Sequence, residues 1–157
     1  MTELKTLRLK NRLTQKEAAN KIGISLRSYV SYENEEALSG TPKYRFLLAE
    51  MSELTRLDEE HGVLTVDEIR EACSEIFKDY SVQYCYLFGS YAKGKATPTS
   101  DIDLLISSEI TGLRFYELTE ILRETLHKKI DLLDMNQLAG NAELLNEVLK
   151  DGIKIYG

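Results

Sequence analysis

Apolar residues recur at helical spacing in the first third of the chain, and the spacing predicts a short amphipathic helix over residues 2–11. Thr14 and Glu17 form a capping-box pattern, which predicts that a second helix begins near Gln15. Gly23 is suited to end that helix, and Ser25 is a good N-cap for a third. Two short helices joined by a glycine turn predict a helix-turn-helix.

The third helix has a polar and an apolar face. Spacing places Leu26, Tyr29 and Val30 inward. The outward face carries Arg27, Ser28 and Ser31. In a major groove, Arg27 could donate twice to guanine, and the serines would give less specific hydrogen bonds. The alternative is a small helical bundle used for dimerisation. Pro42, which is suited to a first helical turn, predicts a further helix.

From residue 65 the pattern changes to alternating helices and strands. Thr65 and Glu68 form a second capping box ahead of an apolar helical stripe. The later apolar segments predict strands at 84–88, 101–107, 129–135 and 152–156, with helices at 115–126 and 144–149. Such alternation predicts an α/β or α+β domain with a small mixed sheet flanked by helices. We therefore expect two domains, residues 1–56 and 65–157, joined by a charged linker at 57–64.

Three aspartates are the candidate catalytic and metal-binding residues. Asp101 and Asp103 are one residue apart on a predicted strand, so their side chains point to the same side. Two like charges held so close favour a cation between them, although such a pair can also merely solvate a strand end. Asp131 begins a later strand and is the natural third carboxylate, whereas Asp134 has the opposite strand parity.

A candidate phosphate site lies upstream of the aspartates. Gly89 permits close approach of a phosphate to the backbone, and a helix from Ser90 would aim free amides at that anion. Lys93 could add positive charge, or it could belong to a solvated lysine loop. In-line attack on the α-phosphorus of a nucleoside triphosphate needs such groups, together with metal ions that neutralise the attacking and leaving oxygens.

Composition adds bounds. The apolar fraction of 43% is ordinary, no apolar run is long enough to span a bilayer, and the first residues lack the pattern of a signal peptide. Cys73 and Cys85 have no metal-ligand spacing and are expected to be buried thiols. We therefore expect a cytoplasmic protein with no membrane partner. Net charge is +3 over residues 1–56 and −9 over 57–157, which suggests separate partners for the two parts.

The apolar strand, Gly89-Ser90, the ten residues that follow and Asp101-Ile102-Asp103 together resemble the minimal nucleotidyltransferases of the DNA polymerase beta superfamily. The resemblance covers most of residues 65–157. It implies that Asp101 and Asp103 bind two Mg²⁺ ions, that Asp131 joins the second and acts as general base, and that Gly89 and Ser90 hold the triphosphate of ATP. Lys93 stands where many relatives have arginine, which keeps the charge but loses a bidentate clamp.

Residues 13–33 resemble the phage-repressor (Xre-type) helix-turn-helix family, with the recognition helix at 25–32. This resemblance places Gln15 near a DNA phosphate, and it makes Ser25, Arg27, Ser28 and Ser31 candidate DNA-binding residues. Residues 34–40 depart from the family, because their acidic side chains would repel DNA phosphates. DNA affinity would then depend on a dimer, since repressor-like domains commonly read two half-sites.

The second domain is too short to include the acceptor domains of larger nucleotidyltransferases. Family members of this size resemble antitoxins that add AMP to a tyrosine of a small HEPN-type ribonuclease toxin. The resemblance thus implies an adenylyltransferase antitoxin, in complex with its toxin or as a homo-oligomer, whose N-terminal domain binds operator DNA. Two alternatives remain: a DNA-binding regulator with an inactive or sensing transferase domain, and nucleotidyl transfer to a small hydroxylated molecule.

Overall fold

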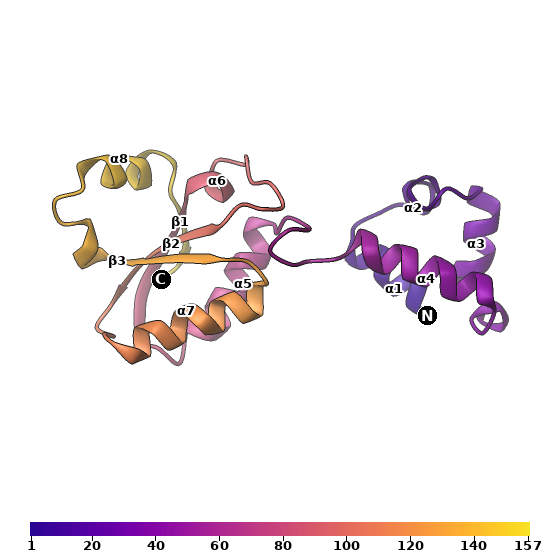
Figure 1. The fold of residues 1–157 in the computed structure, drawn as a ribbon, viewed down its shortest axis with the longest axis horizontal. Coiled ribbons are helices and arrows are strands. Elements are labelled where there is room, and N and C mark those ends of the chain that lie inside the picture. The colour runs from indigo at the N-terminus through magenta and orange to yellow at the C-terminus, as the bar shows by residue number, and fades with distance from the viewer. The chain divides into compact units, whose positions relative to one another are not determined.

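The computed structural model describes all residues from 1 to 157 and divides them into two compact units (Figure 1). The first unit is Met1–Arg56 and the second unit is Leu57–Gly157. Each has its own hydrophobic core. None of the helices is both long and apolar enough to cross a lipid bilayer.

The first unit is entirely helical. Its elements are α1 (Glu3–Lys10), α2 (Gln15–Ile22), α3 (Leu26–Asn34), the 3₁₀ turn η1 (Glu36–Leu38) and α4 (Pro42–Leu54). The predicted capping box is confirmed, because Thr14 accepts from the Glu17 amide and Glu17 accepts from the Thr14 amide. Gly23 ends α2 with φ of 82°, a conformation that costs glycine little. The predicted helix-turn-helix is therefore present.

The core of this unit corrects one detail of the sequence pattern. Tyr29 is completely buried, as predicted for the inward face of α3. Leu26, predicted to share that face, is 45% exposed. It is the first residue of α3, immediately after the N-cap Ser25, where the preceding turn that would cover its side chain is missing. The inward face therefore begins one helical turn later than the pattern indicated.

The second unit is a four-stranded mixed sheet with helices on both faces. Its elements are α5 (Val66–Phe77), β1 (Val82–Phe88), α6 (Gly89–Ala92), β2 (Ile102–Ser108), α7 (Leu113–Leu126), β3 (Ile130–Asp134), η2 (Met135–Leu138), α8 (Ala142–Asp151) and β4 (Ile153–Tyr156). The strand order is β3-β2-β1-β4, with β2 and β3 parallel and the other pairs antiparallel. The predicted fold class is confirmed.

Alternation along β2 divides its side chains between the two faces of the sheet. Leu104 and Ile106 join the main core with apolar residues of α5 and α7. Leu105 faces the opposite way, into a smaller cluster with Leu138 of η2 and Val148 of α8. Figure 1 shows α5 and α7 along one face and α8 along the other. The helix α7 provides the crossover that parallel strands β2 and β3 require.

Residues 57–64, expected as a linker, lie within the second unit. Residues 58–61 form a tight turn in which the Asp58 and His61 backbones bond to each other. Glu59 accepts from Arg123 of α7 at 2.8 Å, which attaches this turn to the helix layer. The segment is therefore a structural part of the second unit.

Candidate active site

Parallel pairing of β2 and β3 places Asp103 and Asp131 side by side in register. Asp101 lies directly before β2, which begins at Ile102 and not at Asp101 as the sequence pattern suggested. The Ile102 amide donates to the Lys129 carbonyl at 2.9 Å. The segments that lead into β2 and β3 are therefore already hydrogen-bonded to each other where the two strands begin. Three aspartates that are up to 30 positions apart in sequence thus meet at one edge of the sheet.

Asp103 is the most buried of the three aspartates, while Asp101 and Asp131 are exposed. Burial, and then repulsion from Asp131 and Asp101, raise the pKa of Asp103 to about 6. Glu147 contributes in the same direction, and Lys93 opposes it. A divalent cation would relieve this repulsion.

Carboxylate oxygens are the ligands that Mg²⁺ prefers, so the donor set fits that ion in kind. In the positions they now occupy, no three potential ligand side chains form a ready coordination shell. Asp101, Asp103 and Asp131 are the residues that would hold the metal, because their mutual repulsion is the electrostatic feature that binding would remove.

Gly89 lies where β1 ends, beside the carboxylate of Asp103. Its φ is +69°, which residues with a side chain rarely adopt, and a Cβ built there would overlap Asp103 Oδ2 and lie 3.0 Å from Cγ. Phe88 and Asp103 are register partners, which explains the close approach. The position therefore requires glycine for two independent reasons.

Ser90 is half-buried in α6, immediately after Gly89. The predicted helix is present but begins at Gly89 and lasts only four residues, so its dipole is small. The amides of Lys93 and Lys95 bond back to the carbonyls of Gly89 and Ser90 at 3.1 and 2.9 Å. The backbone after β1 is thus a compact turn, in which Ser90 follows the glycine that lies against Asp103.

Lys93 is paired with Glu147 on α8, because its Nζ lies 3.0 Å from Glu147 Oε1, so a phosphate would have to compete with that carboxylate. A hydrogen bond from the Glu147 carboxylate raises the pKa of Lys93. Sequence reasoning missed Glu147, which is 54 positions away and stands on the polar side of an amphipathic helix. Glu147 therefore belongs to the electrostatic environment of both Lys93 and Asp103.

The candidate DNA-binding residues of the first unit differ in their availability. Arg27 is exposed on α3, and the Ser25 hydroxyl caps that helix by accepting from the Ser28 amide at 3.2 Å. Ser28 accepts from Lys43 of α4 at 3.3 Å, and Ser31 is half-buried. Arg27 is thus the exposed candidate on α3, and Lys43, which sequence reasoning missed, is a cation that contacts Ser28 of the same helix.

Gln15 donates to Glu33 at 3.0 Å and so is tied to the interior of the first unit. Arg8 makes two further bonds to the same carboxylate, at 2.7 and 2.8 Å. Burial alone would raise the pKa of Glu33, but hydrogen bonds from Arg8 and Gln15 outweigh it, and the pKa is lowered. This network fixes the start of α2 against the end of α3.

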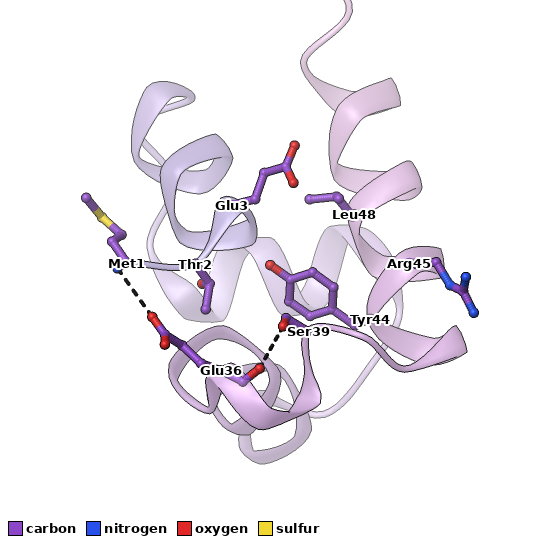
Figure 2. Close-up of a pocket in the computed structure, with 8 residues that line it drawn as sticks. All are labelled: Met1, Thr2, Glu3, Glu36, Ser39, Tyr44, Arg45 and Leu48. Atoms are coloured by element: carbon purple, nitrogen blue, oxygen red, sulfur yellow. Dashed lines mark hydrogen bonds and ion pairs between the residues drawn. The ribbon is translucent and has the colours of Figure 1, made fainter.

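A hollow of about 600 Å³ lies beside the N-terminus of the first unit (Figure 2). Its lining consists of Met1, Thr2, Glu3, Glu36, Ser39, Tyr44, Arg45 and Leu48. The terminal amine pairs with Glu36 at 3.7 Å, as Figure 2 shows. All of these residues belong to the first unit, so this hollow is not part of the aspartate site.

Comparison with known proteins shows the family of each unit. Residues 71–157 match the family model described as polymerase beta, nucleotidyltransferase, and residues 4–41 match a helix-turn-helix model. The protein adenylyltransferase MntA of Thermococcus cleftensis is 34% identical over 83 residues, which are 49% of this chain and 84% of that protein. A candidate protein adenylyltransferase of Methanocaldococcus jannaschii is 36% identical over 47% of this chain and 93% of its own length.

A solved structure described as a candidate minimal nucleotidyltransferase superposes with a TM-score of 0.50 at 26% identity. The superposition covers 59% of this chain and 98% of the other. The family match over residues 71–157 includes Asp101, Asp103 and Asp131. The chain therefore belongs to the polymerase beta family of nucleotidyltransferases, with a helix-turn-helix unit preceding the transferase.

Proposed function

We propose that this chain is a Mg²⁺-dependent adenylyltransferase antitoxin, which transfers AMP from ATP to a tyrosine hydroxyl of a HEPN-type toxin. The observation that carries the proposal is the register of Asp103 beside Asp131, with Asp101 one residue before the strand. The names of the relatives, protein adenylyltransferases in two archaea, support a protein as the acceptor.

The proposed reaction is an in-line displacement at the α-phosphorus of ATP. The tyrosine oxygen forms a bond to that phosphorus, the bond to the β-phosphate oxygen breaks, and pyrophosphate leaves. Asp131, exposed at the edge strand, takes the tyrosine proton. Asp101 and Asp103, together with Asp131, would hold the metal, which would supply charge neutralisation at the phosphate oxygens. Gly89 leaves room for the Asp103 carboxylate beside the backbone, and Ser90 offers a hydroxyl to the triphosphate.

Incubation with α-labelled ATP, Mg²⁺ and the protein encoded next to this chain tests the activity. We expect label on that neighbour and a mass increase of one AMP per modified tyrosine. The double variant Asp101→Asn with Asp103→Asn should abolish transfer. Glu109→Gln, an exposed acid just after the other end of β2, should leave it intact. No label on the neighbour, or equal labelling by the double variant, would refute the proposal.

The first unit is proposed to bind operator DNA upstream of its own gene, with α3 in the major groove. The exposed position of Arg27 supports this role. We expect Arg27→Ala to lower the ratio of affinities for that upstream DNA and a scrambled duplex by roughly tenfold. Arg45→Ala, in the same unit on α4, should leave the ratio unchanged. An unchanged ratio in Arg27→Ala would remove α3 as the reading helix.

A further inference from the structure

Lys128 is a fully buried lysine between α7 and β3. Lysine is almost never buried completely unless its ammonium is paired. Here the Nζ atom donates to backbone carbonyls, not to a carboxylate. The acceptors are the carbonyls of Asp58 at 2.6 Å, His61 at 3.1 Å, Gly62 at 2.7 Å and Pro98 at 2.6 Å. One ammonium thus joins two segments that are distant from each other in the sequence.

The first of these segments is the turn at 58–62, and its shape suits this role. The Asp58 side chain bonds to the Glu60 amide at 2.9 Å and to His61 Nδ1 at 2.8 Å, which closes the turn and gathers its carbonyls. Burial lowers the pKa of Lys128, while the nearby charges of Asp58 and Glu59 oppose that effect. The turn therefore offers an ammonium both acceptors and negative charge.

The second segment is the loop that leads into the candidate active site. Pro98 lies three residues before Asp101, in a turn closed by the Ser100 amide on the Thr97 carbonyl at 3.0 Å. Lys128 itself lies three residues before Asp131. The ammonium thus fixes the loop that leads to Asp101 against the segment that leads to Asp131. The bond from the Ile102 amide to the Lys129 carbonyl continues this link along the strands.

We propose that Lys128 is a positioning residue for the aspartate site, which sets the distance of Asp101 from Asp131 by holding the Pro98 carbonyl and the 58–62 turn together. The inference rests on the proposed role of these aspartates as metal ligands. Lys128 contacts none of them, and its effect is transmitted through the backbone. An apolar side chain of similar size would remove the ammonium that these four carbonyls share. The carbonyls of Asp58 and His61 would keep each other's backbone amide as a donor, but those of Gly62 and Pro98 would lose their donor, and the loop would separate to reach water.

Hydrogen exchange of the metal-free protein tests this link without any catalytic readout. Lys128→Met removes the ammonium and keeps the length of the side chain. We expect amides in both 57–63 and 96–102 to exchange roughly tenfold faster or more, because both segments lose the same anchor. Lys129→Met, the same change at the next and exposed residue, should leave both segments as they are. Faster exchange in 57–63 alone would overturn the proposal.

Binding of Mn²⁺, measured by electron paramagnetic resonance without nucleotide, tests the consequence for the site. We expect Lys128→Met to weaken Mn²⁺ binding by roughly tenfold, while Lys129→Met binds as the parent chain does. Unchanged Mn²⁺ affinity in a folded Lys128→Met variant would show that the lysine does not position the aspartates. Absence of Mn²⁺ binding in the parent chain would instead refute the metal proposal and leave the exchange result standing.

A second variant covers the case in which Lys128→Met does not fold. Lys128→Ala leaves space for n-propylammonium, which replaces the missing part of the side chain without a covalent bond. We expect n-propylammonium at about 20 mM, a concentration suited to a weak affinity on the order of millimolar, to restore slow exchange in both segments. We expect 1-propanol, which has no charge, to have no effect. Restoration in 57–63 alone, or no folding with either compound, would assign Lys128 to the fold in general and overturn the positioning role.

Discussion

The Asp103 carboxylate occupies the space that a side chain at Gly89 would need. Gly89→Ala must therefore displace that carboxylate as well as hold alanine at a φ of +69°. We expect transfer activity to fall by roughly a hundredfold or more, because a displacement of about 1 Å at a reacting centre has that effect. Steady-state kinetics with ATP and the acceptor measure the loss.

Gly94 provides a matched control for this substitution. It has the same φ of +69°, but a Cβ there meets nothing within 4 Å. Gly94→Ala should cost about 1 kcal/mol of stability from backbone strain and retain activity. If the two variants lost activity equally, strain in the loop would explain the effect, and the contact with Asp103 would not.

Asp103 should make stability depend on pH in a direction unusual for an aspartate. Because burial and neighbouring carboxylates raise its pKa to about 6, the folded protein holds this proton more tightly than the unfolded chain does. The contribution is present below the unfolded pKa of about 4 and is lost as pH rises through 6. Asp103→Asn should therefore gain about 1–2 kcal/mol at pH 7.5, after allowance for solvent screening.

Urea unfolding in EDTA at pH 4 and pH 7.5 measures this difference. The gain of Asp103→Asn over the parent chain should be present at pH 7.5 and absent at pH 4. Glu109→Gln, just after the other end of β2, should show no such pH-dependent gain. A gain of equal size at both pH values would contradict the raised pKa as its cause.

The ion pair between Lys93 and Glu147 should weaken the binding of ATP. Nζ and Oε1 are 3.0 Å apart, so a triphosphate that uses Lys93 must first compete with the carboxylate. Glu147→Gln should lower KM for ATP by roughly threefold, the scale of a partly exposed ion pair, and Lys93→Met should raise it. In the Lys93→Met background, Glu147→Gln should no longer lower KM if Lys93 transmits the effect.

Arg8 should stabilise the first unit, because its removal leaves the buried Glu33 carboxylate without its main partner. Arg8→Met is expected to cost about 3 kcal/mol. Hydrogen exchange under increasing urea measures where stability is lost. We expect protection to fall in α1–α4 and to stay unchanged in α5–β4. Lys10→Met, on the exposed side of α1, should change stability by less than about 0.5 kcal/mol. Loss of protection in both units would contradict a local role.

The sequence predicted correctly those features that depend on contacts between residues close together in the chain. The capping boxes at Thr14 and Thr65 are confirmed because each involves residues three positions apart. Asp131 was expected as the third carboxylate because it begins a later strand, but its register beside Asp103 depends on the strand order, which the sequence pattern did not predict. The roles of the candidate site residues in metal, nucleotide and DNA binding stay predictions.

The features that sequence reasoning missed are bonds between distant positions. Glu147 reaches Lys93 across 54 residues, Glu33 meets Arg8 across 25, and Lys128 contacts carbonyls up to 70 residues away. Backbone carbonyls carry no residue-specific signal at all, so nothing in the sequence marks the acceptors of Lys128. Leu26 was misplaced for a related reason, since burial at a helix end depends on what packs over it.

The anchoring of the 58–62 turn also bears on where another module could be joined to the transferase unit without loss of contacts. Motif matching begins the transferase at residue 71, and the capping box suggests 65, yet the structural unit begins at Leu57. A gene fusion that joined another front module after Gly62 would discard three of the four acceptors of Lys128. A junction at residues 56–57 leaves them all in place. A junction that keeps all contacts of Lys128 therefore lies before the turn, ahead of any recognisable transferase motif.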